Sequence, residues 1–185
     1  MGLRYEDNEG DEDMRGLIHI YCGEGKGKTT AAVGLAIRAA GAGKKVLFTQ
    51  FLKNGKSSEL KILESIEGIE ILKGVPVEGF VKHFDEAKKQ KVSGDSKKQL
   101  REVISRAGDY DMVIMDEIIP ACAHGITEES DVADFIKNRP EKPELVLTGR
   151  HPSEALLSLA DYVTEMQKCK HPYDCGVAAR EGIEY

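Results

Sequence analysis

Apolar residues in this chain fall into short, β-rich runs separated by longer stretches with helical spacing. Val113-Ile114-Met115 and Leu145-Val146-Leu147 are apolar at every position, which is typical of strands buried on both faces of a sheet. Strands that alternate with helices indicate an α/β fold, and we predict a single domain with a mostly parallel six-stranded sheet flanked by helices. The predicted strands are Leu17–Cys22, Lys45–Phe51, Ile69–Lys73, Met112–Asp116, Glu144–Thr148 and Tyr162–Met166.

The segments between these strands have the composition and spacing of helices. In one of them Leu100, Val103, Ile104 and Ala107 follow the spacing i, i+3, i+4 and i+7, which gives a helix one apolar face. Residues 74–94 mix Pro, Gly and Lys with little periodicity, so we predict a long loop there that contains one short helix at most. The predicted helices are Thr30–Ala40, Ser96–Ala107, Glu128–Lys137 and Pro152–Ala160.

Negative charge is concentrated at the N-terminus. The whole chain carries a net charge of −6, and residues 1–13 hold six acidic side chains against a single arginine, Arg4. We expect residues 1–14 to form a disordered acidic leader and residues 15–185 to form the folded domain. A broad basic surface, a long apolar run and a signal peptide are all missing from the pattern. We therefore expect a cytoplasmic protein that binds neither nucleic acid nor membrane.

The segment after the first predicted strand gives the strongest chemical signal. Its glycines let backbone N–H groups turn toward phosphate oxygens, and the helix that follows presents its positive end. Lys28 is expected to reach the phosphates of ATP, and the hydroxyl of Thr29 to help hold Mg²⁺. The common P-loop pattern needs glycine where this chain has Cys22, although the loop ends in the usual Gly-Lys-Thr. The predicted nucleotide-binding residues are Gly23, Glu24, Gly25, Lys26, Gly27, Lys28, Thr29 and Thr30.

Charged residues also follow two other predicted strands. Asp116 and Glu117 come at the end of an apolar strand, where P-loop proteins place a carboxylate for Mg²⁺ or its water shell. Arg150 follows the strand Glu144–Thr148, and it either binds phosphate or caps a neighbouring helix. The residues by themselves thus predict an ATP-binding enzyme with a metal site at Thr29, Asp116 and Glu117.

Five segments together resemble the ATP:cob(I)alamin adenosyltransferase family, of the P-loop type whose loop reads G-x-G-K-G-K-T-T. The resemblance covers residues 17–185, with the segments in the order found in that family. The C-terminal ending is the more distinctive part, because few P-loop families share it. The segments are Gly23–Ala32, Gln50–Lys53, Met115–Glu117, Leu147–Arg150 and Lys170–Tyr185.

The resemblance implies a RecA-like fold and a definite reaction for residues 15–185. Members of this family transfer the 5′-deoxyadenosyl group of ATP to the Co(I) of a reduced corrinoid and release inorganic triphosphate, in adenosylcobalamin biosynthesis or salvage. They are usually homodimers, and the Co(I) state requires an electron donor. By position, Lys28, Thr29 and Glu117 are the implied catalytic residues, with Asp116 as a further metal contact.

One loop departs from the family pattern. Well-known members carry Gly-Phe-Thr-Trp in the middle of the chain, whereas this chain has Gly79-Phe80-Val81-Lys82 and contains no tryptophan. The resemblance makes Phe80 a candidate corrinoid-binding residue that approaches the cobalt, and the alternative is that it only anchors the loop.

Two other functions remain open from the sequence. A P-loop kinase or ATPase would transfer the γ-phosphate to a hydroxyl or to water and would form ADP. A non-catalytic carrier of nucleotide or corrinoid would bind its ligand without turnover.

Overall fold

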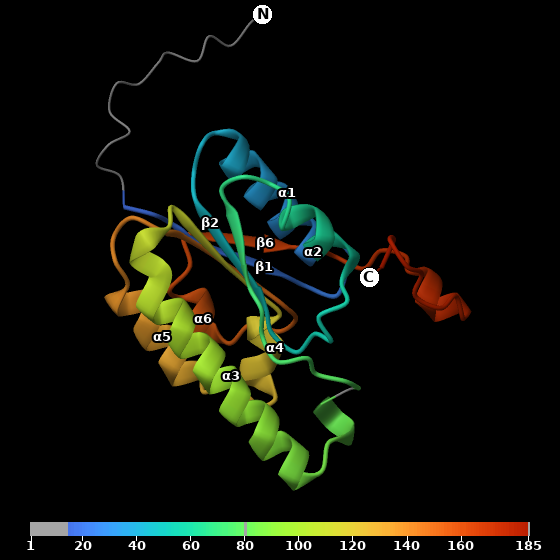
Figure 1. Ribbon diagram of the computed structural model, residues 1–185. Helices are drawn as coiled ribbons and strands as arrows, with labels where there is room; N and C mark the ends of the chain where they lie inside the picture. The colour runs from blue at the N-terminus through green and yellow to red at the C-terminus, as the bar shows by residue number, and fades with distance from the viewer. Residues whose placement is uncertain (1–14, 80, 185) are drawn as a thin grey trace, which may run out of the picture.

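The computed structural model describes residues 15–79 and 81–184 (Figure 1). Its described strands form one six-stranded sheet in the order β3-β2-β4-β5-β1-β6, and every neighbouring pair is parallel. This confirms the predicted α/β class and the parallel sheet. The strands are β1 (Ile18–Cys22), β2 (Val46–Gln50), β3 (Ile69–Leu72), β4 (Met112–Asp116), β5 (Glu144–Thr148) and β6 (Tyr162–Glu165).

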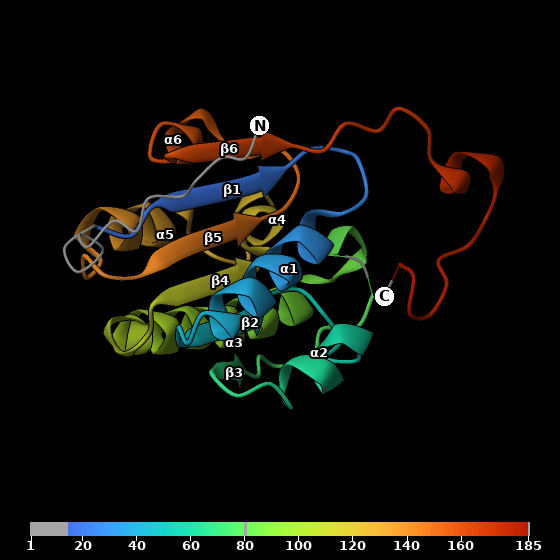
Figure 2. The ribbon, with the colours of Figure 1, turned by 90° about the horizontal axis from the view of Figure 1, so that it is seen from above.

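Helices cover both faces of the sheet. Figures 1 and 2 show α1 and α2 on one face and α3, α4, α5 and α6 on the other. The helices are α1 (Lys28–Gly41), α2 (Ser58–Leu63), α3 (Glu86–Arg106), α4 (Ile118–Ala123), α5 (Glu129–Asn138) and α6 (Glu154–Leu157). Short 3₁₀ turns lie at η1 (Val81–His83), η2 (Ala107–Asp109) and η3 (Pro172–Cys175).

The hydrophobic core has two layers, one on each side of the sheet. In β4, Val113 and Met115 pack into the layer beneath α3 to α6, whereas Met112 and Ile114 pack into the layer beneath α1. The α1 side is lined by small buried residues such as Ala32, which let the helix approach the sheet closely. Because every residue of β4 is buried, this strand has the continuous apolar pattern that predicted it.

The order of the strands sets the position of the functional site. The chain leaves β1, passes through α1 and enters β2, with β4 and β5 lying between those two strands. All the strand arrows point to the same edge of the sheet, where the loop after β1 and helix α4 lie (Figure 2). In open parallel sheets, ligands bind at this carboxyl edge.

The predicted long loop at residues 74–94 is wrong for its second half. Helix α3 begins at Glu86, ten residues before the predicted start, and Asp85 caps it by accepting a hydrogen bond of 2.7 Å from the backbone N–H of Lys88. The buried residues of α3 are Ser96, Leu100 and Val103, all in its second half. The first half extends past the sheet (Figure 1), so its sequence carries no apolar periodicity.

Smaller differences concern short elements. The predicted helix Pro152–Ala160 is only one turn long, Glu154–Leu157, and it begins after the cap at Ser153. Helices α2 and α4 were not predicted, because six residues are too few to show helical periodicity. The acidic leader, residues 1–14, lies outside the described residues. In the described part of the chain, no helix is both long and apolar enough to cross a membrane.

Candidate functional site

The loop after β1 closes around the side chain of Lys28. Gly27 adopts a φ of 118°, a left-handed conformation that favours glycine, and α1 starts at the next residue. The ammonium group of Lys28 is buried and donates to the carbonyl oxygens of Gly23, at 2.7 Å, and Gly25, at 2.8 Å. The side chain of Lys28 therefore lies inside the loop, and its positive charge lies at the start of helix α1.

A second contact fixes the middle of this loop to the end of β6. The N–H of Gly25 donates to the carbonyl of Met166 at 2.6 Å. A Cβ atom at Gly25 would lie 2.6 Å from that same oxygen, so only glycine allows this approach. The absence of glycine at position 22 does not affect the conformation of the loop, because Cys22 belongs to β1 as its buried last residue.

Asp116 accepts hydrogen bonds from three side chains of the site. It is fully buried at the end of β4, and its Oδ1 atom accepts hydrogen bonds from Thr29 Oγ1 at 2.8 Å and from Thr148 Oγ1 at 2.6 Å. Its Oδ2 atom accepts a hydrogen bond from Gln50 Nε2 at 3.1 Å. One carboxylate thus joins the start of α1 to the ends of β2, β4 and β5.

Glu117 has an unusual backbone and an unusual charge environment. Its φ of 60° and ψ of 23° are left-handed, a conformation that costs a non-glycine residue about 1–3 kcal/mol and is concentrated at functional sites. Its backbone N–H donates to Thr148 Oγ1 at 2.9 Å. Burial and the neighbouring Asp116 charge raise the pKa of the Glu117 carboxyl, and Lys53, Lys28 and Arg150 offset part of this rise.

The carboxylates and the hydroxyl of Thr29 fit a magnesium ion. A carboxyl whose pKa is raised beside a second carboxylate gains stability when a cation joins the pair. Mg²⁺ usually takes one or two carboxylates and completes its shell with water and substrate phosphates. Within residues 15–79 and 81–184, no group of three or more His, Cys, Asp or Glu side chains is arranged to hold a metal. Such a group is not needed for an ion that shares its ligands with a nucleotide.

Arg150 lies two residues after the end of β5 and contacts the loop with its side chain. Its guanidinium pairs with Glu24 at 3.1 Å, and His151 contacts the same carboxylate at 2.8 Å. Burial lowers the pKa of Lys28, and the positive charge of Arg150 lowers it further. Arg150 is therefore close enough to act electrostatically on Lys28.

A cavity of about 520 Å³ opens beside the loop. Thr29, Thr30 and Lys26 line it from the loop and α1, and Glu59 lines it from α2. The C-terminal residues Gly182, Ile183 and Glu184 form another wall, and Glu184 lies 3.8 Å from the ammonium of Lys26. Ligand pockets commonly have volumes of about 300–1,000 Å³, so this space can hold a nucleoside.

The structure brings most of the predicted site residues together. The loop residues 23–30, Asp116, Glu117 and Arg150 meet at the carboxyl edge of the sheet. Phe80 lies outside the described residues. Gln50, Thr148 and Glu59 also take part in the site, and their roles were not predicted from the sequence. Thr148 ends a predicted strand and Gln50 lies one residue before the end of another, which is the signal that could have identified them.

Most of the chain also matches known proteins. A model of the family described as ATP:corrinoid adenosyltransferase BtuR/CobO/CobP matches residues 14–185. The chain belongs to this family. It is 36% identical to the corrinoid adenosyltransferase of Escherichia coli K12, over 94% of this chain and 88% of that protein. The corrinoid adenosyltransferase CobA of Salmonella typhimurium is 35% identical with the same coverage, and the Pseudomonas aeruginosa protein is 31% identical over 94% of this chain and 85% of its own length.

The fold is shared more widely than the family. The flagellar accessory protein FlaH of Methanocaldococcus jannaschii superimposes with a TM-score of 0.54 at 16% identity, over 84% of this chain and 73% of FlaH. At that identity the likeness concerns the fold alone. The resemblance to the corrinoid adenosyltransferase family is confirmed by the family match and by the relatives.

Proposed function

We propose that this member of the corrinoid adenosyltransferase family transfers the 5′-deoxyadenosyl group of ATP to the Co(I) of a reduced corrinoid. The observation that carries the proposal is the meeting of Lys28, Thr29, Asp116 and Glu117 at one sheet edge, in a chain that matches the family over residues 14–185. Together they form a binding site for a charged leaving group, and the reaction needs no protein nucleophile.

The reaction is a substitution at the ribose C5′ atom. The electron pair of Co(I) forms the Co–C bond while the C5′–O bond breaks, and inorganic triphosphate leaves with the electrons of that bond. The cobalt centre is thereby oxidised to an alkyl-Co(III) product. Lys28 and the loop N–H groups hold the triphosphate and stabilise its growing charge, and the fixed position of ATP aligns C5′ for attack.

A magnesium ion is part of the proposal. Thr29, Asp116 and Glu117 would hold it beside the triphosphate, with Gln50 and Thr148 orienting the Asp116 carboxylate. When bound, the ion supplies positive charge to the phosphate oxygens. Second-layer hydrogen bonds of this kind fix the direction in which a carboxylate presents its oxygens.

The decisive test is anaerobic incubation with chemically reduced cob(I)alamin, ATP and Mg²⁺. We expect many turnovers to a light-sensitive adenosylated corrinoid, followed in the visible spectrum, with inorganic triphosphate as the second product. Formation of ADP without adenosylation would replace the proposal with an ATPase or kinase. Binding of both substrates without turnover would replace it with a carrier.

The substitution Glu117→Gln should lower activity and raise the stability of the metal-free protein. The folded state binds the Glu117 proton more tightly than the unfolded chain does, because the pKa is raised on folding. Ionisation of Glu117 therefore costs stability as the pH rises through the raised pKa, and below the ordinary carboxyl pKa this cost is absent. We expect Glu117→Gln to raise the Tm at neutral pH and to leave it nearly unchanged at acid pH.

Thermal unfolding in a chelating buffer at both pH values measures this effect. The exposed Glu67→Gln is the matched control and should show no such difference. In the presence of Mg²⁺ and both substrates, Glu117→Gln should lose ~10-fold or more in rate through weakened metal binding. A lower Tm at neutral pH than that of the unaltered protein would contradict the assignment.

Three further properties belong to the same proposal. The family resemblance implies a homodimer and a separate electron donor that makes Co(I), and the composition of the chain favours a cytoplasmic location. Light scattering tests the first of these, and turnover from the Co(II) corrinoid with and without an added electron donor tests the second.

A further inference from the structure

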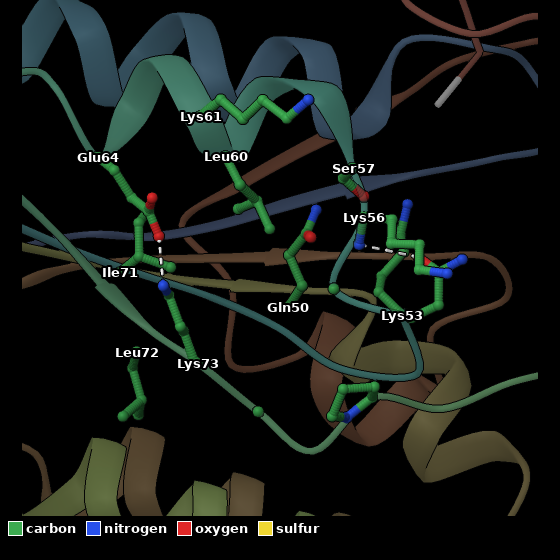
Figure 3. A pocket seen from close by; sticks show the side chains of 14 residues that line it. Gln50, Lys53, Lys56, Ser57, Leu60, Lys61, Glu64, Ile71, Leu72 and Lys73 are labelled. Atoms are coloured by element: carbon green, nitrogen blue, oxygen red, sulfur yellow. Dashed lines mark hydrogen bonds and ion pairs between the residues drawn. The ribbon is translucent and has the colours of Figure 1, made fainter.

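A second cavity, of about 440 Å³, adjoins the proposed active site. It lies between α2, the loop that leads into α2 and the segment that follows β3 (Figure 3). Leu60, Ile71 and Pro76 give it apolar walls. In Figure 3, Gln50 points from the end of β2 toward α2 in the middle of the cavity, and lysines surround it.

The lining carries a concentrated positive charge. Lys53, Lys56, Lys61 and Lys73 contribute ammonium groups, against a single acidic residue, Glu64. Glu64 is paired with Lys73 at 2.8 Å. Among the described residues, Lys53, Lys56 and Lys61 have no ion-pair partner. Three unpaired cations at one cavity in a chain of net charge −6 indicate a site for an anion.

The cavity is connected to the site of the reaction through Gln50. The Nε2 atom of Gln50 donates to Glu59 at 2.9 Å and to Asp116 at 3.1 Å. Glu59 lines the 520 Å³ cavity beside the P-loop, and Lys53 lines both cavities. Gln50 is 9% exposed, and its Oε1 atom is buried without a hydrogen-bond donor among the described residues. A phosphodiester has no donor to offer this atom, so Gln50 links the two cavities but does not itself select an anion.

The position of the cavity indicates which of the two substrates binds there. In the proposed reaction the triphosphate of ATP binds elsewhere, at Lys28 and the N–H groups of the loop. The corrinoid must lie next to the nucleotide so that cobalt can reach C5′, and the lysine-lined cavity adjoins the cavity beside the loop, because Lys53 lines both. A complete corrinoid carries a phosphodiester in its nucleotide loop, and this compact anion has several acceptor oxygens for lysine donors.

We propose that the 440 Å³ cavity binds the phosphodiester of a complete corrinoid through Lys56, Lys61 and Lys53, which makes the enzyme prefer phosphate-bearing corrinoids to those without the nucleotide loop. The inference rests on the proposed adenosyl transfer and adds its substrate class. Lys56 and Lys61 are exposed at the rim, so they recognise the corrinoid without contacting the reacting atoms.

The test compares reduced cobalamin with reduced cobinamide, which lacks the phosphodiester, in the double variant Lys56→Gln/Lys61→Gln. We expect the KM for cobalamin to rise about fivefold at low salt, with kcat unchanged and with the KM for cobinamide unaffected. The difference should shrink as the ionic strength rises. The matched control is Lys44→Gln/Lys137→Gln, which removes two exposed lysines at the opposite edge of the sheet and should leave both KM values unchanged.

Each other outcome overturns the inference in a distinguishable way. Equal losses with both corrinoids would assign the lysines to the part of the ring that the two substrates share. Weakened product inhibition by added triphosphate, without any change in the corrinoid KM, would assign the cavity to triphosphate. No change with either corrinoid would exclude the cavity as a substrate site. If the unaltered protein adenosylates neither corrinoid, the proposed function itself fails.

Discussion

Lys28→Ala should lower the rate of adenosyl transfer by about 10²- to 10³-fold. The Lys28 ammonium is held inside the P-loop by the carbonyl oxygens of Gly23 and Gly25, where the triphosphate is expected to bind. Burial lowers the pKa of Lys28, so the charge is costly in the empty site and is stabilised when a polyanion binds. Alanine removes this charge when the leaving group most needs it. Single-turnover rates with saturating ATP and cob(I)alamin measure the effect on the chemical step.

Lys26→Ala is the matched control on the same loop. The Lys26 ammonium is exposed and lies 3.8 Å from Glu184, so its contribution should stay below about fivefold. Equal losses in both variants would mean that any positive charge near the loop suffices. Near-normal turnover of Lys28→Ala, with inorganic triphosphate still released, would remove Lys28 from the mechanism.

The strand–loop–helix unit that holds the predicted P-loop was predictable because its signal is local. A strand, a glycine-rich turn and a helix follow one another within residues 17–41, and each step has its own pattern in the sequence. The same holds for the buried strands β4 and β5, whose apolar runs identify them without any knowledge of their neighbours. The predicted boundaries of these two strands match the structure at both ends.

The hydrogen-bond network around Asp116 was only partly predictable. Its acid at the end of β4 stands out in the sequence, but its partners Gln50 and Thr148 lie 66 and 32 residues away along the chain. They meet because β2 and β5 are the two neighbours of β4, and the sequence does not state the strand order. The first half of helix α3 was missed for a different reason, since it is polar and has no sheet to pack against.

The positions of the two cavities explain why the Asp116 carboxylate has so many hydrogen-bond partners. The Gln50–Glu59 pair separates the lysine-lined cavity from the cavity beside the P-loop. Asp116 holds Gln50 on one side and Thr29 on the other. Its orientation thus couples the wall between the two proposed substrate sites to the proposed metal position.

Asp116→Asn should reduce adenosyl transfer by ~10²-fold while the protein still folds. An asparagine oxygen can accept from Thr29 and Thr148, but its amide N–H then faces the Nε2 donor of Gln50. The Gln50 amide can rotate by 180° so that its Oε1 atom accepts from the asparagine N–H. Among the described residues Oε1 has no donor in the unaltered protein, but the rotation breaks the hydrogen bond from Gln50 to Glu59. The expected loss of stability is therefore about 1 kcal/mol, the value of one hydrogen bond. The loss of the negative charge removes a contact of the proposed Mg²⁺, and that loss dominates the rate.

Thr148→Val separates these two effects. It keeps the Asp116 charge but leaves the partly buried N–H of Glu117 without its acceptor, so it should cost about 1–3 kcal/mol of stability. Its rate should fall less than tenfold, because the metal contacts remain. Unfolding in denaturant and rates over a range of Mg²⁺ concentrations measure both quantities for the two variants. Higher Mg²⁺ should recover part of the activity of Thr148→Val and little of that of Asp116→Asn. Full recovery of Asp116→Asn at high Mg²⁺ would show that Asp116 only orients its neighbours, and that Glu117 and Thr29 hold the ion without it.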